Sequence, residues 1–255
     1  MKKAILLIAY GAGNPHARRA LSEFERLCRA CAGDLPIRWA YTSEKLRERL
    51  ARERQKSDSV AKALLRLHYE KYEAVAVQPL QVIAGREFNE VAQAVRDVAA
   101  RTGMALSLGR PLLEADLNAV ARGLIRHVPL LRQVHERVLF IGHGARHPAE
   151  SMYLKLAQAL AGVDANCLLG TMGARLHLAE LLPRIGPGPV WLVPLLASVG
   201  THVLRDMAGP DPNSWKSRLE AAGHQCRPVL AGLVESPELA RIWIAHLEGA
   251  LGCLA

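Results

Sequence analysis

Short apolar runs alternate with longer amphipathic stretches along the 255 residues of this chain. Apolar runs of four to six residues are typical of strands buried on both faces, and the stretches between them have the period of helices. The alternation therefore predicts parallel βα units. Eight strands are expected, at residues 4–9, 37–41, 74–77, 105–108, 138–141, 166–170, 190–193 and 225–229. Helices are expected between them, at residues 24–31, 44–56, 60–68, 89–101, 153–160 and 177–182.

The eight expected strands fall into two sets of four whose ends resemble each other. Residues 8–12 (IAYGA) match residues 141–145 (IGHGA). Two further matches occur in the same order, between residues 41–44 and 171–174 and between residues 109–113 and 227–230. The longest match, without a gap, joins residues 79–87 (PLQVIAGRE) to residues 194–202 (PLLASVGTH). Four matches in one order indicate an internal repeat.

The repeat predicts an α/β fold of two pseudo-symmetric halves, residues 1–130 and 131–255, each a four-stranded parallel sheet flanked by helices. Parallel sheets bind ligands at the carboxyl ends of their strands, so two facing halves would line one cleft with strand-end residues. Tyr10 and His143 take equivalent positions in the repeat, and so do Glu87 and His202. These four residues are expected at the cleft.

The two histidines are the strongest candidates for chemistry. His143 lies between two glycines directly after an apolar strand, and His202 follows a strand exit with a glycine two residues upstream. Neutral imidazoles bind divalent Co, Fe, Ni and Zn. A single histidine at a strand end is more often a hydrogen-bonded structural residue, so the metal site rests on the pair. The neighbouring His147 is expected in a loop or cap role. Six other histidines are expected at the surface: His16, His68, His127, His135, His224 and His246.

Other catalytic motifs are absent or incomplete. Gly11-x-Gly13 lacks the third glycine of a dinucleotide-binding fingerprint, because position 16 is histidine. The chain has no phosphate-binding P-loop and no G-x-S-x-G nucleophile elbow. Cys28 and Cys31 have C-x-x-C spacing but lie late in an expected helix, where a thiolate is not stabilised, so we interpret them as structural.

The formal net charge is 33 − 24 = +9, which suits an anionic partner. No nucleic-acid-binding motif accompanies the charge, so a small polyanion fits at least as well, and a solvated basic surface stays open. No apolar stretch reaches the length of a membrane span. Residues 4–10 are interpreted as a first buried strand and not as part of a signal peptide. We therefore expect a cytoplasmic protein without a nucleic-acid or membrane partner.

Several segments together resemble a known family. Residues 140–144 (FIGHG), 200–202 (GTH) and 211–216 (DPNSWK) are similar in order and spacing to the anaerobic sirohydrochlorin cobaltochelatases, which are class II tetrapyrrole chelatases. The resemblance covers nearly the whole chain. It implies a lyase of the chelatase-like fold that inserts Co²⁺, or Fe²⁺, into sirohydrochlorin or a related carboxylate-rich tetrapyrrole during anaerobic cobalamin biosynthesis. It also implies that the metal is a substrate and that no cofactor is tightly bound.

The resemblance assigns roles to residues, with one departure. It implies that His143 and His202 hold the metal together with a glutamate that follows the sixth strand, and that His143 is catalytic. The resemblance places that glutamate at position 173, which is glycine here. Glu87 is the first candidate to replace it and could otherwise bind substrate, and His177 is the second.

The substrate's carboxylates would meet cationic side chains near strand exits, for which the candidates are Lys45, Arg86, Arg175 and Arg205. Tyr10, Glu87 and Arg86 are expected to bind the tetrapyrrole. The departure at Gly173 leaves open a second function, a non-catalytic tetrapyrrole carrier. Homo-oligomerisation also stays open.

Overall fold

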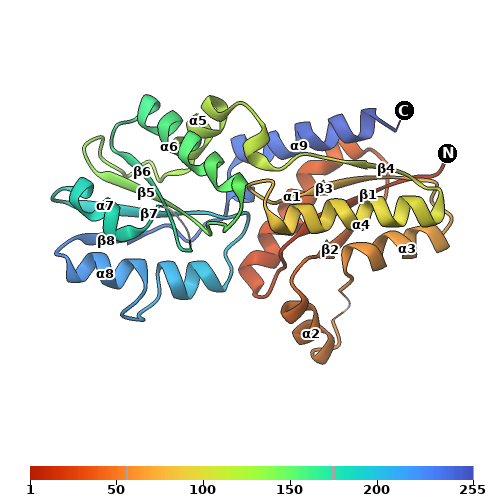
Figure 1. The fold of residues 1–255 in the computed structure, drawn as a ribbon, viewed down its shortest axis with the longest axis horizontal. Helices are drawn as coiled ribbons and strands as arrows, with labels where there is room; N and C mark the ends of the chain where they lie inside the picture. The colour runs from red at the N-terminus through yellow and green to blue at the C-terminus, as the bar shows by residue number, and fades with distance from the viewer. Residues whose placement is uncertain (56, 174–175, 255) are drawn as a thin grey trace. The chain divides into compact units, whose positions relative to one another are not determined.

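A computed structural model describes residues 1–55, 57–173 and 176–254. It contains two four-stranded parallel sheets flanked by helices, which confirms the predicted fold class (Figure 1). The chain forms two compact units, residues 1–114 with 240–255 and residues 115–239. Each predicted half contains one of these sheets. The compact units differ from the predicted halves in two segments. The helix at residues 117–127 belongs to the second unit, and residues 240–255 belong to the first.

The sheet of the first unit has the strand order β2-β1-β3-β4. Its strands are β1 (Lys3–Ala9), β2 (Ile37–Tyr41), β3 (Ala74–Pro79) and β4 (Ala105–Leu108). Its helices are α1 (Pro15–Ala32), α2 (Glu44–Arg52), α3 (Val60–Tyr69), α4 (Arg86–Thr102) and the larger part of α9 (Pro237–Gly252). Every observed strand of the two sheets begins and ends within two residues of its predicted range.

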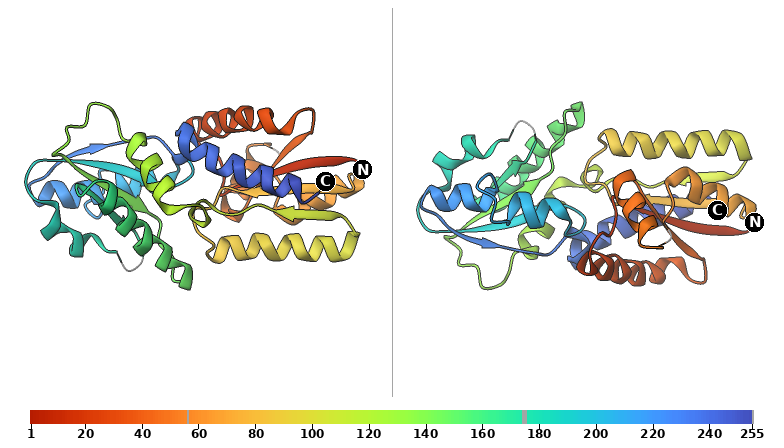
Figure 2. Two further views of the ribbon diagram at one scale, coloured as in Figure 1. Left: turned by 90° about the horizontal axis from the view of Figure 1, so that it is seen from above. Right: turned by 90° about the horizontal axis from the view of Figure 1, so that it is seen from below.

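Helices cover both faces of this sheet. Alternate residues of β1, among them Leu6 and Ile8, pack against apolar residues of α3 and α4. Helix α1 lies on the face opposite α4, and the C-terminal part of α9 runs beside α1 (Figure 2). There the buried rings of Phe24 and Trp243 make an edge-to-face contact with centroids 6.3 Å apart. The edge-to-face contact attaches the C-terminal segment to the first unit although it lies more than 200 residues from α1 in sequence.

The second unit repeats the topology with the strand order β6-β5-β7-β8. Its strands are β5 (Arg137–Gly142), β6 (Cys167–Thr171), β7 (Pro189–Leu195) and β8 (Gln225–Pro228). Its helices are α5 (Leu117–His127), α6 (Ser151–Val163), α7 (Leu178–Ile185) and α8 (Trp215–Ala221). A π-helix spans His202–Met207, and 3₁₀ turns occur at Leu112–Glu114 in the first unit and at Pro148–Glu150 and Leu233–Glu235 in the second.

The faces of the second sheet are covered in the same manner. Leu139 and Ile141 of β5 pack with apolar residues of α7, α8 and the π-helix. Helices α5 and α6 pack on each other and lie on the opposite face (Figure 1). The shared strand order confirms the internal repeat that the sequence indicates. None of the helices in the described part of the chain is long and apolar enough to cross a membrane.

The six histidines expected at the surface are buried to different degrees: His135 is exposed, His16, His68, His127 and His224 are half-buried, and His246 is buried. His246 is buried, with 6% of its surface exposed, and its Nδ1 lies 3.0 Å from the carbonyl oxygen of Arg110. His127 is half-buried, and burial lowers its pKa below the ordinary histidine value. The surface prediction was wrong for both residues, because His127 lies one turn after the buried Leu124 of α5 and His246 lies one turn after the buried Trp243 of α9. Cys28 is buried, and burial raises its thiol pKa to about 12, which supports the structural interpretation.

Candidate metal site in the second unit

His143 follows β5 in a tight turn whose two glycines have separate reasons. A Cβ at Gly142 would lie 3.0 Å from Cε1 of the buried Tyr153 ring, closer than ordinary side-chain contacts. Gly144 has a φ of +78°, which side-chain-bearing residues rarely adopt. The turn leaves the His143 side chain exposed at the carboxyl end of the strand. The backbone freedom that the sequence predicted around His143 is therefore used at Gly144, whereas Gly142 makes room for Tyr153.

The turn around His143 is held by hydrogen bonds from the neighbouring strand exit and from a buried acid. Residues 172 and 173 donate their backbone N–H groups to the carbonyls of Gly142 and His143, at 3.0 and 3.1 Å. The N–H of Ala145 donates to the Glu150 carboxylate at 2.6 Å. Glu150 is only 5% exposed, and the Thr171 hydroxyl lies 3.5 Å from its other oxygen. These bonds position the His143 backbone before any ligand arrives.

His202 is the first residue of the π-helix that follows β7. The wider winding shows in the hydrogen bond from the Ala208 N–H to the Val203 carbonyl, five residues back, at 3.0 Å. Gly209 follows the end of the π-helix. A glycine is needed there, because a Cβ atom would lie only 2.5 Å from the Arg205 carbonyl oxygen. The buried Ser214 hydroxyl then donates to the Gly209 carbonyl at 2.8 Å. Single π-turns are frequent at functional sites, and this one places His202 beside β5.

The structure brings the two predicted histidines together within one unit. The ring centroids of His143 and His202 lie 4.7 Å apart, with an angle of 76° between the ring planes. The His143 Nδ1 atom lies 3.1 Å from the Gly144 carbonyl oxygen, and the His202 Nδ1 atom lies 2.6 Å from Oδ2 of Asp206. Metal–nitrogen bonds are about 2.0–2.1 Å long, so the ring separation suits two ligands of one ion.

Asp206 completes a short chain of polar groups behind His202. Its second oxygen, Oδ1, accepts from Arg205 Nε at 2.7 Å. Partial burial alone would raise the Asp206 pKa, but the hydrogen bonds from Arg205 and His202 outweigh it and hold the pKa below its ordinary value. The Asp206 carboxylate is therefore ionised at neutral pH. Nothing in the sequence analysis singled out Asp206 or Glu150, although the spacing of four residues between His202 and Asp206 is a detectable signal.

Four other predicted site residues, Tyr10, Lys45, Arg86 and Glu87, belong to the first unit. Tyr10 follows β1 and is 54% exposed, and Glu87 is exposed in the first turn of α4. Arg86, beside it, is paired with Glu90 through Nε at 2.9 Å. These three residues belong to the first unit, and their roles stay predictions. Lys45 is exposed on α2 in the same unit.

The position that departs from the family pattern lies next to His143. The Gly173 N–H is bonded to the His143 carbonyl, so this residue borders the histidine pair. His177 is exposed immediately before α7. His147 caps the 3₁₀ turn, since its Nδ1 accepts from the Ala149 N–H at 3.2 Å, and the cap interpretation is confirmed. Arg175 lies outside the described residues. Among described residues, no group of three or more His, Cys, Asp or Glu side chains is arranged to hold a metal ion.

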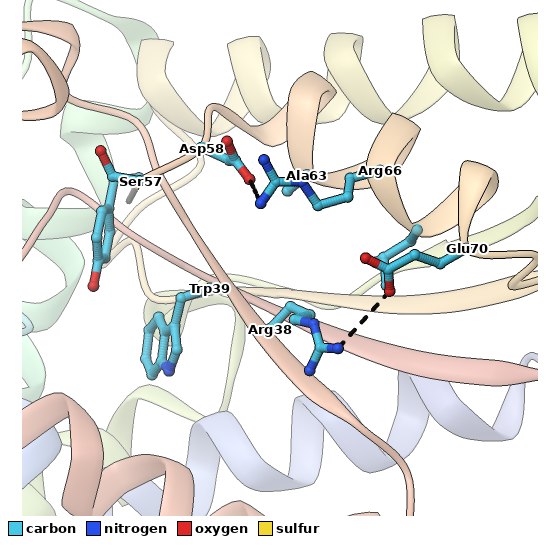
Figure 3. Close-up of a pocket in the computed structure, with 9 residues that line it drawn as sticks. Arg38, Trp39, Ser57, Asp58, Ala63, Arg66 and Glu70 are labelled. Carbon is cyan, nitrogen blue, oxygen red and sulfur yellow. Dashed lines mark ion pairs between the residues drawn. The ribbon is translucent and has the colours of Figure 1, made fainter. Parts of the chain in front are cut away.

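A separate cavity of about 300 Å³ lies in the first unit, between β2 and α3 (Figure 3). Two ion pairs line it, Arg66 with Asp58 at 2.8 Å and Arg38 with Glu70 at 3.8 Å. Its lining contains none of the residues that the sequence analysis singled out as site residues. The sequence did not predict this cavity.

Comparison with known proteins decides the family. The model of the cobalt chelatase (CbiK) family matches residues 3–252. The chain belongs to the cobalt chelatase family. It is 44% identical to the sirohydrochlorin cobaltochelatase CbiKC of Nitratidesulfovibrio vulgaris, over 99% of this chain and 92% of that protein. It is 32% identical to the sirohydrochlorin cobaltochelatase of Salmonella typhimurium, over 98% of this chain and 97% of that protein. The predicted family resemblance is confirmed.

Solved structures share the fold of this cobalt chelatase family member. SirB from Bacillus subtilis with Fe³⁺ has a TM-score of 0.66 at 15% identity, covering 98% of this chain and 96% of SirB. SirB from Bacillus subtilis subspecies spizizenii in complex with cobalt has a TM-score of 0.65 at 16% identity, covering 99% and 97%. At these identities the likeness concerns the fold, and it confirms the predicted chelatase-like architecture.

Proposed function

We propose that this chain is a chelatase that inserts Co²⁺ into sirohydrochlorin or a closely related carboxylate-rich tetrapyrrole, with Fe²⁺ as a second metal substrate. The observation that carries the proposal is the pair of histidine rings, 4.7 Å apart at two strand exits of a cobalt chelatase family member. The step would belong to anaerobic cobalamin biosynthesis in the cytoplasm. Metal and tetrapyrrole are both substrates here, and no resident cofactor is part of the proposal.

Insertion of a metal into a tetrapyrrole requires a metal ligand and a base at the same place. The macrocycle must lose two pyrrole N–H protons as the metal exchanges its earlier ligands for pyrrole nitrogens. Imidazole has an unperturbed pKa of about 6.5 and can accept a proton near neutrality. His143 and His202 would hold Co²⁺ against the ring. As the metal passes to the pyrrole nitrogens, His143 would accept one pyrrole proton and His202 the other. Holding both reactants together supplies the proximity that accelerates the step.

A third ligand would complete the metal site beside the two histidines. Glu87 is our first candidate, supported by its exposed position at the start of α4 and by its equivalence to His202 in the repeat. His177 is the second candidate, supported by its exposure before α7. Tyr10 and Arg86 would contact the tetrapyrrole, and the guanidinium of Arg86 would exchange Glu90 for a substrate carboxylate.

A carrier that binds tetrapyrrole without inserting metal is the second function, and Gly173 is the observation that motivates it. The family match and both curated relatives, named as cobaltochelatases, favour the enzyme. Anaerobic mixing of the protein with sirohydrochlorin and Co²⁺, followed by absorption spectroscopy against a protein-free control, separates the two. Accelerated formation of the metallated spectrum supports the chelatase. A spectrum of bound, unmetallated tetrapyrrole, with metal insertion no faster than in the protein-free control, would identify the carrier.

A further inference from the structure

We propose that Asp206 is a positioning residue for the chelatase reaction, because it fixes His202 in the tautomer that presents Nε2 to the metal. The inference rests on the proposed function for its consequence but not for its geometry. The decisive observation is the 2.6 Å separation between His202 Nδ1 and Asp206 Oδ2.

The tautomer follows from which groups can donate. An ionised carboxylate only accepts hydrogen bonds, so a neutral His202 must carry its proton on Nδ1 to make this bond. Its Nε2 atom then has a free lone pair, which is the form that binds a metal or accepts a proton. In metal sites the ligating histidine commonly donates its other nitrogen to a carboxylate or carbonyl, which orients the ring and strengthens its donor power.

His143 has the same arrangement with a weaker partner. Its Nδ1 atom lies 3.1 Å from the Gly144 carbonyl oxygen, which also accepts only. Both rings therefore present Nε2, but among the described residues a charged partner is found for His202 alone. The neutral carbonyl leaves His143 the less strongly fixed of the two, so the loss of Asp206 should affect His202 alone.

Asp206 is itself held in place. Arg205 Nε bonds its second oxygen at 2.7 Å, so the carboxylate has little freedom to turn away from His202. The pair lies on the π-helix, where residues four apart are close to one another along one face. The backbone at Gly209, where there is no room for a Cβ atom, packs against the Arg205 carbonyl and fixes the end of the π-helix. The fold thus builds the His202–Asp206 contact into the backbone geometry.

The first test reads the tautomer in the metal-free protein. Long-range ¹H–¹⁵N correlation at about pH 8, where histidine is neutral, should show His202 protonated at Nδ1. In Asp206→Asn the resonances should report a mixture or the other tautomer, while those of His143 stay unchanged. Protonation of wild-type His202 at Nε2 would overturn the inference, and this reading needs no variant to fold.

The second test measures Co²⁺ binding by anaerobic titration with absorption and calorimetric detection. Asp206→Asn should weaken binding by about 10–100-fold, the usual effect of losing such a partner, with an unchanged circular dichroism spectrum. Asp206→Glu should recover part of the loss. Asp97→Asn, which removes an exposed carboxylate on α4, should bind as the wild type does.

The outcomes separate the two proposals. Wild-type binding by Asp206→Asn, in a protein whose wild type binds and inserts Co²⁺, would contradict the positioning role and leave the proposed function standing. A wild type that neither binds nor inserts Co²⁺, although His202 is protonated at Nδ1, would contradict the proposed function and leave the tautomer assignment standing.

Discussion

Gly173 and His143 are joined through the backbone, with the glycine N–H donating to the histidine carbonyl at 3.1 Å. A Cβ at Gly173 would lie 3.4 Å from that carbonyl oxygen, which is an ordinary van der Waals distance. Apart from its chain neighbours, no other heavy atom of the described residues would lie within 4 Å of it. The φ of Gly173 also lies outside the left-handed region. The position can therefore accept a side chain at the border of the histidine pair without backbone strain.

We expect Gly173→Glu to raise the rate of Co²⁺ insertion, because it adds an anionic oxygen ligand and a proton acceptor beside the two imidazoles. A third ligand of this kind should also tighten Co²⁺ binding by about tenfold or more, corresponding to about 1.4 kcal/mol. Anaerobic titration and the insertion assay measure both effects. Gly173→Gln is the matched control, since it has the same size without the charge. Equal behaviour of the two variants would show that a carboxylate at this position is not what the site lacks.

Gly142→Ala should destabilise the protein by about 1–3 kcal/mol, because the new methyl group would be forced against the buried Tyr153 ring. Gly162→Ala is the control on the neighbouring helix α6, where a Cβ meets no described atom within 4 Å. That change should be neutral or stabilising by up to about 1 kcal/mol. Chemical denaturation of the two variants measures the difference. Equal stabilities would show that Tyr153 does not confine Gly142.

The buried carboxylate of Glu136 should make stability depend on pH in acid. A hydrogen bond from the Trp191 indole at 2.7 Å, opposed by burial and helped by the Gln133 N–H and by Arg227, holds its pKa below the ordinary value of about 4.5. A lowered folded-state pKa stabilises the fold fully above the unfolded-state value and loses that effect as the pH falls through the folded-state value.

Glu136→Gln should therefore lower the free energy of unfolding near pH 7 by about 1.5 kcal/mol, the scale of a hydrogen bond to a charged group. The gap between variant and wild type should narrow below about pH 4.5. Urea unfolding of both proteins from neutral pH to below pH 4.5 measures this difference in the free energy of unfolding. Glu23→Gln, at an exposed pair with Arg26, should show little difference at any pH. A gap that widens in acid would contradict the assigned direction.

The sequence predicted the two sheets well because parallel strands are buried on both faces and their apolar runs are conspicuous. The repeat also placed His143 and His202 at strand exits. In the structure they follow β5 and β7, and their ring centroids lie 4.7 Å apart. The packing of His246 was not predictable in the same way, because its burial depends on residues more than 100 positions away, at Arg110. The partners of the site were missed for a similar reason: Glu150 meets Ala145 and Thr171 only after the loop and strand have folded.

The central claim is that His143 and His202 together hold the metal during insertion, and one measurement tests it most directly. The anaerobic rate of Co²⁺ insertion into sirohydrochlorin is compared for the wild type, His143→Ala and His202→Ala, with His224→Ala, a half-buried control in the loop before β8, measured beside them. Both site variants should lose most of the rate above the protein-free control while keeping the wild-type circular dichroism spectrum, because His143 is exposed and neither ring is part of the buried core. Wild-type rates in both His143→Ala and His202→Ala would contradict the account.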